Sequence, residues 1–485
     1  MALIINTNIQ SLNAQRNLSK TLSPLETAMK RLSSGLRINS AKDDAAGLSI
    51  ATRMSSQVRG LNQAIRNAND AISLVQTTEG AIDEITNALQ RVRELAVQSA
   101  NASNTSVDRG ALDLEAQQLL AEVDRIATQT QFNNQTLLDG TLGSKSYQVG
   151  AYAGQTISVS ITTGLKLTQI GQIAEATGSA VTTNALSNGG MTIAIGDGDA
   201  ISIGASEDGT GAGQDDYSAY AKAEAIRAAG ISGLTVTAQN SVEETTAFAD
   251  ITGAAADDTY TLTVNGVTVY DALNINGVTL TAGDVAAQIN LYSSDTGVSA
   301  SVDATSGKIT LSTTDGRNIS VQEDFAGTTG LSGVGLDDSI AGEGSAVETR
   351  GTITLSATEN ITLTGSYADI GHSATILRDS TTLSSIDVKS VTNANTTMKR
   401  IDSALSAVAN LRAELGAINN RFESTISNLS NVVENVTAAR SRIMDADFAA
   451  ETANMTKALI LQQAGISILS QANSLPQNVL ALLQG

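Results

Sequence analysis

Few side chains in this sequence could carry out chemistry. The 485 residues contain no cysteine and one histidine, His372. This composition excludes thiol catalysis, cysteine-ligated metal sites and the two-histidine zinc site of helix-borne metalloproteases. We expect His372, in the segment Ile370-Gly-His-Ser-Ala, to be a surface or strand-edge residue. The sequence therefore predicts a protein that is not an enzyme and that needs no cofactor or metal.

Carboxylates are the other candidate ligands. Gly196-Asp-Gly-Asp199 and Glu207-Asp208 lack the spacing and terminal glutamate of an EF-hand loop, so solvated turns are favoured. Residues 181–390 hold 27 acidic and 7 basic residues, which accounts for the whole net charge of −20. An acidic middle suits a solvated outer surface and argues against binding nucleic acid.

No run of 18 apolar residues occurs, so we expect no transmembrane helix and no membrane partner. The first residues lack a charged region followed by an apolar core, so we expect no cleavable signal peptide.

Long helical patterns occupy both ends, 1–130 and 396–485. Ser23-Pro-Leu-Glu26 looks like a capping box that begins a helix. Apolar residues then recur every three or four positions, as in coiled-coil packing. The residues that we assign to this helix seam are Leu61, Ile65, Ile72, Leu89, Val92, Leu415, Ile418, Phe422 and Leu429. The mean step of 3.5 residues between 401 and 436 favours a left-handed supercoil.

The last segment, from Phe448 to Leu483, carries two apolar stripes. One stripe comprises Met455, Leu459, Ile466 and Leu469, and the other Leu461, Ile468 and Leu475. Periodicity alone fits an ordinary helical bundle. A helix with two apolar stripes needs partners on more than one side, and one chain offers too few, so we expect other copies to cover it.

The middle of the chain is β-rich. Tyr147–Ile161 predicts a hairpin beside the helices, and Asn265-Gly266 between alternating segments is a strong hairpin signal. We predict two related modules, at 188–240 and 259–323. The expected fold class is α+β multidomain, with an N- and C-terminal α-helical coiled-coil-like bundle and a β-rich inserted outer region.

The ends resemble bacterial flagellin in several long motifs. The matching segments are Leu12–Leu18, Arg31–Leu48, Arg66–Asp70, Leu415–Phe422, Arg442–Phe448 and Gln471–Leu480. The segment Ile275-Asn-Gly-Val-Thr-Leu280 is similar to the small β-rich insert motif of many flagellins and hook-associated proteins. The resemblance covers about 1–145 and 385–485.

This resemblance implies a structural subunit that polymerises into the flagellar filament for swimming. It implies an inner helical domain (1–44 with 450–485), a helical domain with a hairpin (45–180 with 391–449) and a variable outer region (181–390). The inner helices are expected to order only on assembly. Export through the flagellar type III apparatus, an extracellular location, and contacts with an export chaperone, cap proteins and hook-junction proteins are also implied.

Arg91, Leu95 and Glu115 fall in segments that resemble the flagellin surface read by the mammalian Toll-like receptor for flagellin. Packing between subunits is the alternative role for these three, and both roles can hold because the same face would be buried in the filament. For Leu95 packing comes first. Two other functions stay open at this point, a hook–filament junction protein and a secreted adhesin that displays the outer region.

Overall fold

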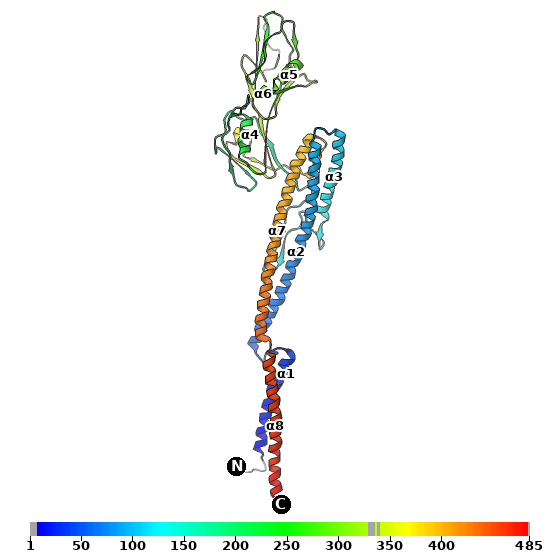
Figure 1. Cartoon of the computed structure of the whole chain (residues 1–485), viewed down its shortest axis with the longest axis vertical. Helices are drawn as coiled ribbons and strands as arrows, with labels where there is room; N and C mark the ends of the chain where they lie inside the picture. The colour runs from blue at the N-terminus through cyan, green and yellow to red at the C-terminus, as the bar shows by residue number, and fades with distance from the viewer. Residues whose placement is uncertain (1–6, 328–334, 337–339, 484–485) are drawn as a thin grey trace. The chain divides into compact units, whose positions relative to one another are not determined.

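The computed structural model describes residues 7–327, 335–336 and 340–483. The chain divides into two compact units, each assembled from separate stretches of sequence. The first unit consists of residues 1–79, 142–162 and 413–485, and the second of residues 80–141 and 163–412. The expected α+β class is confirmed, because long helices form both ends and strands form most of the middle (Figure 1).

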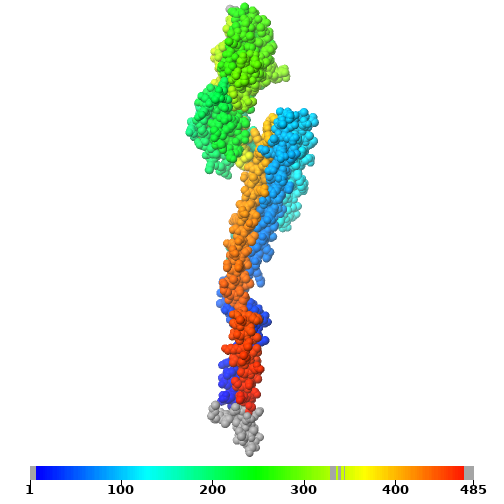
Figure 2. Space-filling model, in the orientation of Figure 1, coloured from blue at the N-terminus to red at the C-terminus, as the bar shows by residue number. Residues whose placement is uncertain are grey.

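Helices α1 (Ile9–Ser34) and α8 (Phe448–Leu483) lie side by side in the first unit (Figures 1 and 2). The side chain of Asn8 caps α1 by accepting a hydrogen bond from the Ser11 N–H, and Gly35 ends it in the left-handed conformation. The predicted start at Ser23 is wrong, because α1 runs through Pro24. Proline removes one backbone donor but leaves the packing on α8 in place, so the helix continues.

Two longer helices contribute to both units. Helix α2 (Ala45–Ala100) and α7 (Val391–Met444) have 56 and 54 residues, so each is about 80 Å long at 1.5 Å per residue. Helix α3 (Ser106–Gln129) belongs to the second unit and begins with a capping box between Thr105 and Asp108. Within the first unit, Leu36 and Asp445 form an antiparallel bridge, so the α1–α2 and α7–α8 links are paired.

The predicted hairpin forms in the first unit from β3 (Gly143–Gln148) and β4 (Thr156–Ile161). It packs on both long helices there. The Tyr147 ring meets Phe422 of α7 edge-on at 6.1 Å, and the Asn67 amide of α2 donates to the Gln148 carbonyl at 2.9 Å.

In the second unit, β1 (Gln131–Phe132) and β2 (Gln135–Thr136) form a short ribbon. Residues 174–378, which we call the insert, form the remaining sheets. One five-stranded sheet has the order β13 (Ser299–Val302), β14 (Ile309–Thr313), β8 (Leu234–Glu243), β18 (Thr352–Ala357), β5 (Ala174–Thr177). A four-stranded sheet has the order β20 (Thr375–Ile376), β19 (Ile361–Gly365), β6 (Met191–Ile195), β7 (Ile201–Ser202).

The third large sheet has the order β11 (Val267–Asn274), β10 (Thr259–Val264), β15 (Ile319–Ala326), β16 (Gly342–Glu343), and β17 (Val347–Thr349) also pairs with β15. Strands β9 (Ile251–Thr252) and β12 (Thr279–Leu280) form a separate pair. The predicted turn joins β10 to β11, with Asn265 at φ 47° and Gly266 at φ 75°. Positive φ at both central positions is the geometry that makes Asn-Gly favourable.

Two segments of the insert repeat the same order of hairpin, helix and strand. The first contains β6, β7, α4 (Ala219–Ala228) and β8, and the second contains β10, β11, α5 (Ala282–Leu291) and β13. A short helix α6 (Ser293–Thr296) follows α5. Each segment has its own buried core. Strand β8 joins the two, because its first half pairs with β18 and its second half with β14.

Candidate assembly surface

The contact between α1 and α8 is a narrow seam in which small side chains alternate with leucines and other larger residues. Along both helices the buried and half-buried positions advance in alternating steps of three and four residues, as in a coiled coil. On α1 they are Ser11, Ala14, Leu18, Thr21, Leu25, Ala28 and Leu32. On α8 they are Glu451, Met455, Ala458, Gln462, Gly465, Leu469 and Ala472.

Polar contacts stand at the two ends of this seam. The Arg31 guanidinium pairs with the Glu451 carboxylate at 2.8 Å, and Glu451 is largely buried. At the other end the Asn8 amide donates to the Ala472 carbonyl at 2.8 Å. Because an unpaired carboxylate is costly in such a place, the pair favours this alignment of the two helices.

Many large apolar side chains of these helices point away from the seam. On α8, Ile460 is 62% exposed and Ile468 is 59% exposed. The other exposed large apolar residues of the two helices are Ile9, Leu12, Leu22, Met29, Phe448, Leu459, Leu461 and Ile466. So much apolar surface on one helix pair is typical of an interaction site.

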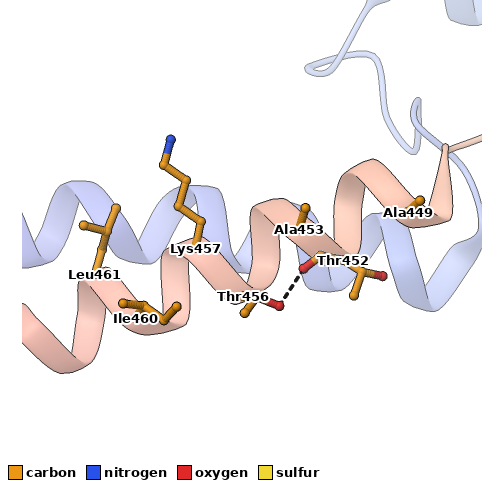
Figure 3. Close-up of a pocket in the computed structure, with 7 residues that line it drawn as sticks. All are labelled: Ala449, Thr452, Ala453, Thr456, Lys457, Ile460 and Leu461. Atoms are coloured by element: carbon orange, nitrogen blue, oxygen red, sulfur yellow. Dashed lines mark hydrogen bonds between the residues drawn. The ribbon is translucent and has the colours of Figure 1, made fainter.

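One part of this surface is a shallow hollow on α8, drawn in Figure 3. It is lined by Ala449, Thr452, Ala453, Thr456, Lys457, Ile460 and Leu461. The Thr456 hydroxyl is turned inward to the Thr452 carbonyl at 2.8 Å, which leaves its methyl group for contact. Beyond Lys457 the sequence has no charged residue. A neutral surface can meet another copy of itself without repulsion.

The two predicted stripes of α8 divide between these surfaces. Met455 and Leu469 are half-buried on the α1 seam, whereas Leu459 and Ile466 are exposed. Leu461 and Ile468 of the second stripe are also exposed, and the side chain of Leu475 lies outside the described part. Whether other copies cover them stays a prediction.

The seam between α2 and α7 differs in detail from the predicted one. Leu61, Leu89, Val92, Leu415 and Phe422 are buried as expected. The other predicted seam residues are half-buried: Ile65, Ile72, Ile418 and Leu429. Ala64, Ala68 and Ala71 of α2 are more deeply buried than these isoleucines.

Burial falls away along α7 within the first unit. Phe422 is fully buried, but the apolar residues that follow at seam spacing are only half-buried. They are Ile426, Leu429, Val432, Val433 and Val436. In the second unit, by contrast, α2 residues such as Ile82 and Ile85 are completely enclosed. The exposed apolar surface of the helices is therefore concentrated in the first unit.

Of the three residues assigned to a receptor-like surface, two are exposed together. The Arg91 guanidinium of α2 contacts the Glu115 carboxylate of α3 at 2.8 Å and the Glu94 carboxylate at 2.9 Å. The hydrogen bonds that Arg91 donates to the Glu94 and Glu115 carboxylates raise the pKa of Arg91. Placing Leu95 on this surface was wrong, because it is 1% exposed and packs inside the second unit. Its spacing matches that of the core residues Leu89 and Val92.

The candidate chemical groups do not form a reactive site. His372 is buried, and its Nε2 lies 2.9 Å from the Ile353 carbonyl, so the expectation of a surface residue was wrong. Burial lowers the pKa of His372. Among the described residues, no group of three or more acidic, histidine or cysteine side chains could hold a metal ion. No helix in the described ranges is long and apolar enough to cross a membrane.

Two buried cations, Lys222 and Arg400, and the half-buried Arg317 were not anticipated from the sequence. Lys222 donates to the carbonyls of Thr182 and Asp369, Arg317 pairs with Asp315, and Arg400 pairs with Asp379. Only Asp315 is a near neighbour of its cation along the chain. The one signal available was the scarcity of basic residues in an acidic region.

Comparisons with known proteins agree with this architecture. Residues 5–142 match the bacterial flagellin N-terminal helical region, residues 398–483 the C-terminal helical region, and residues 261–315 the flagellin hook IN motif. The last match spans β10 to β14, which is the second repeated segment of the insert. The first repeated segment lies outside these three ranges, so its relation to the second stays a prediction.

Relatives match over their whole length. The B-type flagellin of Pseudomonas aeruginosa is 40% identical over 531 aligned residues, and flagellin of Salmonella typhimurium is 39% identical over 518, each covering 100% of both chains. The solved structure of FliC from Burkholderia pseudomallei is 22% identical and covers 72% of this chain and 99% of that one, with a TM-score of 0.30. These full-length matches favour a filament subunit over a junction protein or an adhesin. The chain belongs to the bacterial flagellin family, whose members are the structural subunits of the flagellar filament.

Proposed function

We propose that copies of this chain polymerise through the exposed apolar faces of α1 and α8. The observation that carries the proposal is the exposure of Ile460, Ile466 and Ile468 on a helix whose other face is already occupied by α1. Covering a large aliphatic side chain contributes about 1.5–3 kcal/mol. Several such side chains per subunit, repeated along a filament, give a strong assembly from individually modest contacts.

The layout that we propose follows from this surface. Residues 1–44 and 450–485 form the inner layer, residues 45–180 and 391–449 surround it, and residues 181–390 project outward. The half-buried stripe of α7 from Ile426 to Val436 supports a second, outer ring of contacts between copies. The acidic charge of 181–390 supports a solvated, extracellular surface.

The remaining partners are proposed on the family resemblance together with these surfaces. The neutral, apolar stretch beyond Lys457 needs protection before assembly, which supports an export chaperone. Cap and hook-junction proteins would meet the same faces at the ends of a filament. Arg91 and Glu115, exposed together on α2 and α3, are the residues that we retain for the Toll-like receptor surface. We propose no catalytic role, no nucleic-acid partner and no membrane partner.

The proposal is tested by seeded growth of filaments from depolymerised subunits. Ile460→Ser should raise the critical concentration about 10- to 100-fold, since each 1.4 kcal/mol changes an equilibrium tenfold. Because Ile460 is exposed in the single chain, circular dichroism of the depolymerised variant should match that of the parent.

Leu291→Ser is the matched control. Leu291 is 72% exposed but belongs to α5 of the insert, so its loss should leave the critical concentration unchanged. Equal critical concentrations for the parent and Ile460→Ser would contradict the proposed surface. An equal rise in critical concentration for Ile460→Ser and Leu291→Ser would also contradict it, because the effect would then not depend on the α8 surface.

A further inference from the structure

Two stretches carry the chain between the helices and the insert, one before β5 and one after β20. They run alongside each other. The Leu383 N–H donates to the Ile170 carbonyl at 3.1 Å, and the Asp379 N–H donates to the Ile173 carbonyl at 2.9 Å. From Ile170 to Ile173 the partner moves back from Leu383 to Asp379, so the two stretches are antiparallel. We call residues 170–173 and 379–383 the stalk.

A single side chain of α7 contacts both halves of the stalk. The Arg400 guanidinium donates to the Gly171 carbonyl at 3.1 Å and to the Thr381 carbonyl at 2.6 Å. It also binds the Asp379 carboxylate through two nitrogen–oxygen contacts, at 3.1 and 2.5 Å. Arg400 is 6% exposed. Its planar group is therefore fixed on several sides, as a bidentate arginine pair requires.

The surroundings are shaped to this arrangement. Ser403, one turn along α7, donates to the Gln172 carbonyl at 2.6 Å, so a second residue of the same helix face holds the stalk. Gly171 has φ +86°, and a Cβ there would lie 2.6 Å from the Leu383 side chain. Glycine is thus required for the close approach of the two halves.

The charges at this site are compensated. Burial raises the pKa of the Asp379 carboxyl, but hydrogen bonds from Arg400 and from the Ile173 N–H outweigh it and hold that pKa below its usual value. Asp379 is therefore ionised at neutral pH and opposes the Arg400 charge. Removing either partner leaves a buried charge uncompensated.

We propose that Arg400 is a positioning residue that locks the stalk onto α7, so that the insert is held at a fixed orientation on the helices of the second unit. With the lock, the insert moves as part of the second unit. In a polymer, each copy would then present its insert at the same angle.

The experiment measures the distance between the two parts with a pair of spin labels. The chain has no native cysteine, so Gln118→Cys on α3 and Asp199→Cys in the β6–β7 turn label two exposed sites alone. In the depolymerised parent we expect one narrow distance peak. Arg400→Met should lose that peak and give a broad distribution, with helix content unchanged by circular dichroism.

Arg93→Met is the matched control. Arg93 of α2 pairs with Asp402 of α7 at 2.6 Å, and Asp402 is two residues from Arg400 in the sequence. This pair is exposed, and the hydrogen bonds of Arg93 go to Asp402 rather than to the stalk. Arg93→Met should keep the narrow peak. Asp379→Asn, which keeps the shape and the backbone contacts of Arg400, should broaden the peak by a smaller amount.

A folded Arg400→Met chain with the narrow peak of the parent would overturn the proposal. If Arg400→Met does not fold, Asp379→Asn decides, and a narrow peak in that variant overturns it. Loss of helical structure in both variants would also overturn it, because the pair would then be needed for folding rather than for positioning.

Discussion

In the insert, side chains such as Leu262 and Ile353 are enclosed by strands and helices of the same chain, whereas in α8 Ile460 and Ile468 project into solvent. The buried Lys222 of the insert donates to two backbone carbonyls. The first region has the properties of a self-sufficient domain. The second has those of half an interface, so its stability depends on other copies.

Deleting residues 458–485 should have the largest effect on this contrast. The deletion removes five of the ten exposed large apolar side chains of α1 and α8 and leaves α1 with only the first ten residues of its partner helix, so we expect filament growth to be lost. Among the described residues, neither core of the insert includes a side chain of α8, so thermal unfolding of the insert should be unchanged. Light scattering with seeds and calorimetry measure the two outcomes. Filament growth by the truncated chain would contradict the proposal that α8 is half of an interface between copies.

The converse change is Leu262→Ala in β10. Leu262 is completely buried in the second core of the insert, so we expect a loss of about 2–5 kcal/mol in the unfolding free energy of the insert. Filament growth below the unfolding temperature should continue. The exposed Leu291→Ala serves as the control and should change stability by less than about 0.5 kcal/mol. Loss of filaments in Leu262→Ala at low temperature would show that the insert takes part in assembly.

A smaller effect is expected from pH, and only in the insert. Burial lowers the pKa of Lys222 to about 8, below its unfolded value of 10.5. Between these two values the unfolded chain binds more protons than the folded one, so stability rises with pH. We expect a gain of about 2 kcal/mol between pH 7 and 9.5. Below pH 8 the penalty for burying the charge is fully present.

Tyrosines set the upper limit of that window. Burial raises the pKa of Tyr217 to about 12 and raises that of Tyr260 well above its usual value, so folding opposes their ionisation and stability falls again above pH 10. Denaturant titrations followed by near-ultraviolet circular dichroism of the tyrosines measure the curve. Lys222→Met should abolish the rise below pH 10. A flat curve in the parent would mean that folding does not lower the pKa of Lys222, so that the folded and unfolded chains carry the same charge there.

The same contrast explains what could be predicted from the sequence. Local rules identified the elements: Asn265-Gly266 marked its hairpin, and heptad spacing marked the long helices. The contacts between distant segments were missed, including Arg400 with Gly171 and Arg31 with Glu451. Sequence spacing carries no information about residues that meet only after the chain returns through the insert.

Burial along the helical seam differs from the pattern for another reason. Ile65 and Ile72 were chosen because they are large, yet they are half-buried whereas Ala64 and Ala68 are buried. When a pattern contains two adjacent stripes, size alone does not say which stripe faces the partner within the chain and which faces another copy. Whether the half-buried members of the predicted seam face another copy stays a prediction.

The smallest effect is expected for the exposed ion pair on the second unit. Arg91→Met breaks contacts with Glu94 and Glu115 that are open to solvent, where such pairs contribute little, so the thermal midpoint should stay within experimental error. Activation of the Toll-like receptor for flagellin by the depolymerised chain should nevertheless fall, because a guanidinium presented on that face is lost. Arg125→Met, which removes an equally exposed arginine paired with Glu122 on α3, is the control and should leave activation unchanged. Equal activation by the parent and Arg91→Met would mean that the receptor does not recognise the Arg91 side chain. The role of this face would then be restricted to packing between subunits.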